Sequence, residues 1–206
     1  MTEPMKYGQT EFEVHLPPEL IAAELEPNQV DLPQRTTAEH IRWALDHPID
    51  SAPLKELVKA GDKVCVIISD VTRRWQAPDT YLPILIAELE AAGVRDEDIL
   101  ILSATGTHRR QTEEEHIGLV TKPVYDRIRV EDHVCTDQDN LAYVGTTSRG
   151  TPVWLDKRAL ACDKIILTGG VVYHFMAGFG GGRKSILPGI AGRETIMKNH
   201  NLALNP

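Results

Sequence analysis

The sequence predicts an α/β fold: a Rossmann-like three-layer domain with a mainly parallel sheet, plus a hairpin and edge strands. Two observations carry this prediction. Residues 64–69, 99–102 and 164–168 each contain a continuous apolar run, which is typical of strands buried on both faces of a parallel sheet. Strand, loop and helix patterns alternate along the chain, as they do when helices cover such a sheet.

The first 36 residues are interpreted as an N-terminal extension that carries an edge strand. Residues 11–16 alternate polar and apolar side chains, a pattern typical of a half-buried strand, and the proline pair that follows ends it. Thr36 and Glu39 have the spacing of a capping box, which predicts a helix that Pro48 closes.

Two more helices and a hairpin are expected further along. A helix is predicted to begin at Asp79 or Thr80 and to end at Ala92, before a glycine. Thr112 precedes three glutamates and opens a short helix with acids at its positive end. Two apolar runs flank residues 148–150, whose composition is typical of a hairpin turn.

Composition argues against several classes of protein, among them nucleic-acid binders and membrane proteins. The chain has 206 residues, enough for one ordinary domain, and a net charge of -8, which argues against a sequence-independent nucleic-acid binder. Residues 64–68 form its longest apolar stretch, far short of the ~18 residues of a membrane helix. No signal peptide is visible, and the three scattered cysteines are expected to be reduced, in the cytoplasm. They are Cys65, Cys135 and Cys162.

A glycine-rich segment near the end of the sequence is its most informative motif. Residues 178–189 contain five glycines interleaved with bulky apolar residues, unlike a flexible linker, and Lys184 lies within them. Backbone amides of such a loop, together with Arg183, suit an anion. A Walker A phosphate loop nearly fits residues 178–185, but Arg183 stands where that motif needs a glycine.

Polar loops follow three of the predicted strands. Residues 70–73 follow the first, residues 105–109 the second, and His174 with the glycine-rich segment the third. Ligands of open α/β sheets bind at the carboxyl ends of strands, so these loops are expected to converge on one site. Arg73 could either brace its loop by pairing with Asp70 or bind a substrate carboxylate with two hydrogen bonds.

Three histidines are candidates for chemistry. His108 follows a buried strand and is followed by two arginines, which would favour its neutral form, while His174 and His200 lie on either side of the glycine-rich segment. A plain zinc site formed by the three is a weak alternative, because no spacing typical of zinc ligands is present. The other five histidines are interpreted as surface or capping residues.

Taken together, these motifs resemble the N-terminal domain of the nickel-pincer lactate racemase family. The resemblance rests on five matches in order along residues 69–200. They are Ser69-Asp70-Val71-Thr72-Arg73, Thr105-Gly106-Thr107-His108-Arg109, His174, the run from Gly180 through Gly181, Gly182, Arg183, Lys184 and Ser185 to Gly189, and His200.

The resemblance implies specific roles. Lys184 would be tethered through a thioamide to a pyridinium mononucleotide that holds nickel in a sulfur–carbon–sulfur pincer, and His200 would complete the nickel coordination. His108 and His174 would be the acid/base pair, and Arg73 would bind substrate. The residues implied to surround the cofactor are Asp70, Thr72, Gly180, Gly181, Gly182, Arg183 and Ser185.

The implied activity is racemisation or epimerisation of a 2-hydroxy acid, lactate or a relative. The carbon-bound hydrogen of such an acid is too weakly acidic for histidine to remove, so it would leave as hydride while a histidine takes the hydroxyl proton. Partners would be the substrate and the enzymes that make the cofactor. A non-catalytic nucleotide-binding domain and a phosphate-binding ATPase-like domain remain as alternatives.

Two departures from the family pattern qualify the resemblance. Arg74-Trp75-Gln76 stands where the family usually continues with proline, so the substrate could differ from lactate. Family members are also about twice as long. Residues 1–206 would therefore be the N-terminal cofactor-binding domain, without the C-terminal domain that would act on it in cis or in trans, and activity at this length alone is left open.

Overall fold

The computed structural model describes residues 2–8, 10–26 and 28–204. The chain divides into two compact units, Met1–Gln34 and Arg35–Pro206. In the first unit, β1 (Thr2–Tyr7) and β2 (Thr10–His15) form an antiparallel hairpin, followed by the short 3-10 helix η1 (Pro18–Leu20). The strand expected at 11–16 is β2, whereas its partner β1 was missed because its side chains are all exposed and show no alternation.

A four-stranded parallel sheet organises the second unit, as the sequence predicted. Its strands are β3 (Val64–Ser69), β4 (Ile99–Ala104), β5 (Arg129–Asp132) and β8 (Lys164–Leu167), in the order β5-β4-β3-β8. The expectation that β8 is fully buried is wrong. As an edge strand it has one neighbour only, and its first two residues are exposed.

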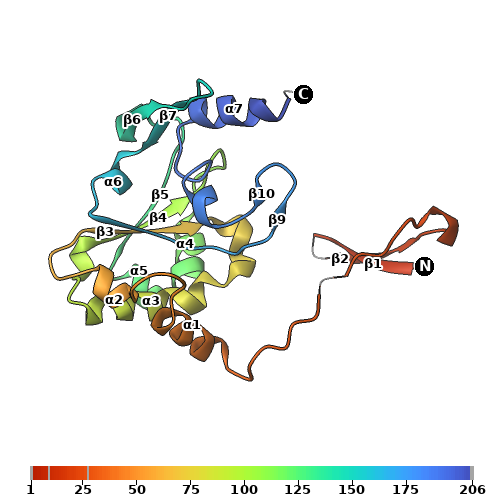
Figure 1. The fold of residues 1–206 in the computed structure, drawn as a ribbon, viewed down its shortest axis with the longest axis horizontal. Helices are drawn as coiled ribbons and strands as arrows, with labels where there is room; N and C mark the ends of the chain where they lie inside the picture. Colours follow the sequence, from red (N-terminus) through yellow and green to blue (C-terminus); the bar gives the residue numbers. More distant parts are fainter. Residues whose placement is uncertain (1, 9, 27, 205–206) are drawn as a thin grey trace. The chain divides into compact units, whose positions relative to one another are not determined.

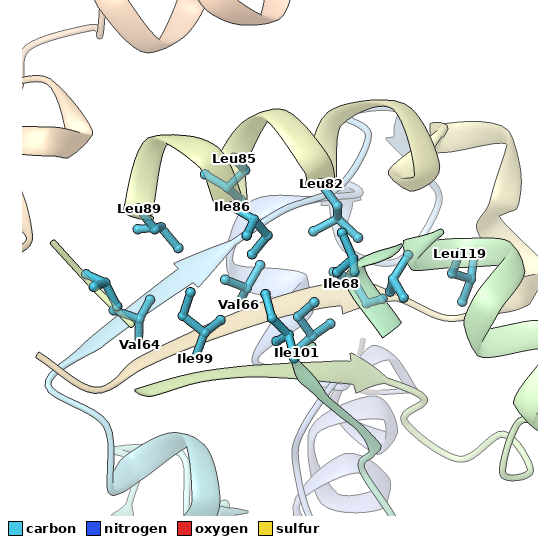
Figure 2. Close-up of a cluster of buried hydrophobic side chains, with 14 of the residues drawn as sticks. Val64, Val66, Ile68, Leu82, Leu85, Ile86, Leu89, Ile99, Ile101 and Leu119 are labelled. Carbon is cyan, nitrogen blue, oxygen red and sulfur yellow. The ribbon is translucent and has the colours of Figure 1, made fainter. Parts of the chain in front are cut away.

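Both faces of the sheet are covered, which accounts for the three layers. Val64, Val66 and Ile68 of β3 point to one face and meet α3 (Pro78–Ala91), as Figure 2 shows. Cys65 and Ile67 point to the other face, where they pack with Ile190. This alternation is the period of a strand, and burial on both sides explains the continuous apolar run.

The helices divide between these two faces (Figure 1). On one side lie α1 (Thr37–Asp46), α2 (Leu54–Leu57), α3, α4 (Glu113–Val120) and α5 (Lys122–Tyr125), which contribute to one apolar core. On the other side lie the hairpin β6 (Leu141–Thr146) and β7 (Pro152–Asp156), then α6 (Lys157–Leu160) and α7 (Arg193–Asn201). The β6–β7 hairpin was predicted from its turn.

The remaining elements are short. They are the two-residue strands β9 (Tyr173–His174) and β10 (Gly178–Phe179), and the 3-10 helices η2 (Val71–Gln76), η3 (Asp96–Asp98), η4 (Gln138–Asn140), η5 (Gly182–Ser185) and η6 (Leu202–Leu204). Within the described part of the chain, no helix combines the length and the hydropathy needed to span a bilayer.

Helix starts were predicted well where a side chain forms the cap. The predicted capping box is present, with Thr36 as the N-cap of α1 and Glu39 in its first turn. The helix predicted after Thr112 is α4, and Thr112 with Glu115 forms a second capping box there. The predicted start of α3 at Asp79 or Thr80 is wrong, since this helix begins at Pro78 and no side chain caps it. Proline at the first helical position needs no hydrogen-bonded N–H and already has a helical φ.

A buried ionic cluster connects the last residue of β7, Asp156, to Ala191, just before α7. The His133 ring contacts Asp156 Oδ2 through Nδ1 at 2.9 Å and the Ala191 carbonyl through Nε2 at 3.0 Å. Arg158 Nη2 donates to the same carboxylate at 2.6 Å. Burial alone would raise the pKa of Asp156, but the hydrogen bonds from Arg158 and His133 outweigh it and lower that pKa to about 2.

This cluster should make stability fall in acid. Because the pKa of Asp156 in the folded chain lies below its ordinary 3.8, its contribution is present above pH 3.8 and is lost as pH falls toward 2. We expect urea unfolding to reveal a loss of about 2 kcal/mol over this window that Asp156→Asn no longer shows. The exposed Asp139→Asn is the control, and an unchanged acid slope in Asp156→Asn would contradict the prediction.

Candidate functional site

A cavity of about 600 Å³ opens at the carboxyl ends of β3, β4 and β8. The chain leaves β3 to build β4 and β5 on one side and returns to place β8 on the other, so the strand order reverses beside β3. Such a reversal separates the loops and leaves a crevice for ligands. The predicted convergence of the three loops is confirmed. The polar residues that line the cavity are Ser69, Arg73, Gln76, Thr105, Thr107, His108, Arg149, His174, Lys184, Ser185, Asn199 and His200.

His108 is held by a carboxylate behind the cavity wall. Its Nδ1 makes a short hydrogen bond with Asp70 Oδ2, and the Asp70 side chain is only 2% exposed. The other oxygen of Asp70 accepts from Thr72 Oγ1 at 2.6 Å and from Arg73 Nη1 at 3.2 Å. Asp70 therefore orients both a cavity imidazole and a cavity guanidinium, and the ion pair considered for Arg73 does form.

Lys184 lies half-buried in η5, and its amine faces the cavity without a carboxylate within ion-pair distance among the described residues. Burial lowers the pKa of Lys184, and the nearby guanidinium of Arg73 lowers it further. A lowered pKa increases the fraction of neutral, nucleophilic amine.

Gly189 ties the Lys184 segment to the His108 loop. Its N–H donates to the Lys184 carbonyl at 3.1 Å, and its own carbonyl accepts from the Gly106 N–H at 3.0 Å. A Cβ at Gly189 would lie 2.1 Å from the Ser185 carbonyl oxygen and 2.8 Å from the Ala104 Cβ. Glycine is thus required for a close approach between two loops that come from distant parts of the sequence.

His174 ends the short strand β9 and is fixed by its own loop. Its Nδ1 accepts the backbone N–H groups of Met176 and Ala177, each at 3.2 Å. Desolvation lowers the pKa of His174, and the positive charges of Lys184 and Arg73 lower it further. All three effects disfavour the imidazolium form of His174.

His200 reaches the cavity from the last turn of α7. Ile196, Asn199 and His200 share one face of this helix, at the spacing of neighbouring turns, and all three line the cavity. The Nδ1 atom of His200 is buried, and no atom in the described part of the chain is its hydrogen-bond partner. A buried ring nitrogen without a partner is unfavourable unless a ligand satisfies it.

The cavity is cationic although the chain is acidic. Arg73, Lys184 and Arg149 line it with three histidines, and no Asp or Glu is among the described lining residues, in a chain of net charge -8. Arg149 was missed as a site residue, because residues 148–150 showed only the composition of a turn. The tip of the β6–β7 hairpin places it there. This lining favours an anionic ligand.

Some predicted cofactor residues do not line the cavity. Asp70 and Thr72 lie behind His108 and Arg73, and Gly182 and Arg183 are exposed outside the lining. Ser185 does line the cavity, together with Gly180 and Gly181, but its hydroxyl donates to the Thr168 carbonyl at 3.3 Å. The geometry therefore allows Ser185, Gly180 and Gly181 to contact a ligand in the cavity. It gives no such support to the four residues that do not line the cavity.

The two alternative sites find little geometric support. The lysine of a Walker A motif opens a long helix, whereas Lys184 lies in a 3-10 turn of four residues. No group of three or more His, Cys, Asp or Glu side chains in the described ranges is arranged to hold a metal ion, so a plain zinc site formed by the three histidines gains no support here.

Two of the residues that follow Arg73 border the cavity. Trp75 and Gln76 both line it, and the Trp75 ring would lie 3.0 Å from a Cβ at Gly170. The Oε1 atom of Gln76 is buried and has no hydrogen-bond partner among the described residues. These two side chains therefore shape the cavity beside Arg73.

Comparisons with known proteins agree with the geometry. A lactate racemase from Lactiplantibacillus plantarum is 38% identical over 79% of this chain and 38% of its own length. A lactate racemase from Thermoanaerobacterium thermosaccharolyticum is 32% identical over 94% of this chain and 45% of its own. The chain thus spans less than half the length of these relatives.

Solved structures of related proteins have a similar fold. The lactate racemase apoprotein from Thermoanaerobacterium thermosaccharolyticum superposes with a TM-score of 0.78 at 31% identity, covering 96% of this chain and 45% of that one. A protein from Thermotoga maritima superposes with a TM-score of 0.64 at 26% identity, covering 80% and 40%. The family model for the lactate racemase N-terminal domain matches residues 7–206. The chain therefore belongs to the lactate racemase N-terminal domain family.

Proposed function

We propose that this chain is the cofactor-binding domain of a racemase or epimerase that acts on a small 2-hydroxy acid. The observation that carries the proposal is the meeting of Lys184, three imidazoles and Arg73 in one cavity. Two relatives are named lactate racemases, which supports an isomerase of this class. A further domain or partner chain, in cis or in trans, would complete the enzyme, because the chain spans less than half of those relatives.

The residues present fit a nickel-pincer nucleotide attached at Lys184. Lys184 has a lowered pKa and, within residues 2–8, 10–26 and 28–204, no carboxylate partner, which favours the neutral amine that covalent attachment uses. His200 offers a buried nitrogen that none of these residues hydrogen-bonds. Imidazole suits nickel. The absence of a three-ligand cluster among the described residues agrees with a metal held mainly by an organic ligand. When bound, this group would supply a centre that accepts and returns hydride.

The protein side chains would do the binding and the proton transfer. Arg73 lines the cavity, and Asp70 engages the Nη1 atom of its guanidinium. A guanidinium at this place suits a substrate carboxylate. Arg149 adds a second positive charge for a carboxylate or for the nucleotide phosphate. His108 and His174 would exchange protons with the substrate hydroxyl, one histidine for each enantiomer.

A non-catalytic carrier of the same cofactor is the second candidate, favoured by the exposure of His108, whose side chain is 45% accessible. A reaction that transfers hydride needs a site from which water is excluded. Turnover assays of the chain with and without the C-terminal half of a relative separate the two candidates. Racemisation only in the presence of that half would identify a catalytic domain.

Intact-mass spectrometry tests the attachment. We expect the chain, co-expressed with the enzymes that make the cofactor, to gain one pincer nucleotide, and nickel by elemental analysis. Lys184→Arg keeps the charge but cannot form the thioamide, so the added mass should fall to zero. Lys198→Arg, on the surface of α7, is the matched control. Unmodified wild-type chain, or an adduct that survives in Lys184→Arg, would refute the proposal.

A further inference from the structure

The two imidazoles proposed as the acid/base pair, His108 and His174, are held by different kinds of partner. A carboxylate contacts His108, whereas backbone N–H groups contact His174. A carboxylate can only accept hydrogen bonds and a backbone N–H can only donate them. The partner at each Nδ1 therefore decides which ring nitrogen carries the proton.

For His108 the proton belongs on Nδ1. Asp70 Oδ2 is its partner, and Asp70 Oδ1 already accepts from Thr72 and from the Arg73 guanidinium, which stabilises the ionised carboxylate. The neutral ring then has its lone pair on Nε2. His108 can accept a proton there without any rearrangement.

For His174 the opposite holds. Two N–H groups, of Met176 and Ala177, point at Nδ1, so this atom must present its lone pair and the neutral ring carries its proton on Nε2. An imidazolium would place a third N–H against these two donors. In this loop conformation His174 can donate a hydrogen bond from Nε2 but cannot accept a proton there.

We infer that Asp70 and the loop 175–177 set His108 and His174 in opposite tautomers, so that the resting cavity has one base and one hydrogen-bond donor. This assignment deepens the proposed function, and its catalytic consequence rests on it. An enantiomer whose hydroxyl meets His108 finds a ready base, and Nε2 of His108 takes the hydroxyl proton to give an imidazolium. An enantiomer whose hydroxyl meets His174 requires this loop to release Nδ1 first.

Asp70 is on this view a positioning residue, since it touches His108 and not the cavity. A charge-assisted hydrogen bond is about twice as strong as a neutral one, enough to favour one tautomer about tenfold. Asp70→Asn replaces the obligatory acceptor with an amide that can donate to Nδ1. The preference of His108 should then fall below twofold or reverse, while His174 stays unchanged.

Long-range ¹H–¹⁵N spectra of the histidine-labelled chain test this directly. They are recorded at a pH above the titration of both rings and assigned with His108→Gln and His174→Gln. We expect a protonated Nδ1 in His108 and a protonated Nε2 in His174. The same tautomer in both rings, or the reverse pair, overturns the inference.

Two variants separate the two fixing groups. Asp70→Asn should alter only the His108 signals, and Ala177→Pro, which removes one N–H donor, should alter only those of His174. An unchanged His108 tautomer in folded Asp70→Asn would refute the role of Asp70, and Ala177→Pro tests the other half should Asp70→Asn not fold. Because these spectra need neither cofactor nor turnover, a failure of the proposed racemase function would leave their result intact.

Discussion

Replacing His200 with alanine should release nickel from the cofactor-loaded protein, whereas His108→Ala and His174→Ala should retain the metal and lose turnover by about 10²–10⁴-fold. The reason lies in the surroundings of the ring nitrogens. His200 presents a buried nitrogen that no described residue hydrogen-bonds, the property expected of a metal ligand, while the Nδ1 atoms of His108 and His174 are already engaged by protein groups.

Elemental analysis and racemisation assays, run on the same preparations with the complementary C-terminal half supplied, separate these effects. Asn199→Ala removes a cavity side chain adjacent to His200 and is the control for loss of metal, and His40→Ala on α1 is the control for turnover. Loss of nickel from His108→Ala or His174→Ala would overturn the division between metal ligand and acid/base residues.

Replacing Gly189 with alanine should destabilise the fold by about 3 kcal/mol or more. The added methyl group would lie 2.1 Å from the Ser185 carbonyl oxygen, a backbone atom that no rotamer change can move aside. Relief requires the 185–189 turn to open. That movement would break the hydrogen bonds from the Gly189 N–H to Lys184 and from the Gly106 N–H to Gly189.

Urea unfolding of Gly189→Ala and Gly182→Ala measures this effect against a matched control. Gly182 has φ +50 and open space around its Cβ position, so its substitution meets only the backbone cost of about 1–2 kcal/mol. We expect Gly189→Ala also to weaken attachment at Lys184, since the turn positions that amine. Equal stability losses in the two variants would show that packing at Gly189 is not the deciding factor.

Local signals in the sequence were sufficient wherever a single element decides the outcome. The strand predicted at 64–69 is β3 with the same bounds, because burial on both faces of a sheet makes its first five positions apolar. A capping box located the start of α1, and Thr112 followed by three acids located the start of α4, because both signals lie within one turn of the helix. The start of α3 was misplaced because Pro78 opens this helix without any side-chain cap.

The site was predictable in part. Parallel strands end at one edge of a sheet, so the loops after β3, β4 and β8 had to meet, and the motifs on them supplied His108, His174 and Lys184. Arg149 gave no such signal, because the path of the β6–β7 hairpin brings it to the cavity. The distinction between Asp70, which lies behind the cavity, and Arg73, which lines it, likewise depends on side-chain direction.

The sequence by itself determined the class of fold, the sheet-edge location of the site and the chemical types of side chain that meet there, because periodicity, capping and motif order are local properties of a chain. Only the tertiary structure decided which atoms of those side chains are free. The Nδ1 atom of His108 meets a carboxylate 38 positions away, a contact that exists only when the two loops are packed together. The Nδ1 atom of His174 meets two N–H groups of its own loop, and that contact depends on the backbone conformation that this loop adopts in the fold.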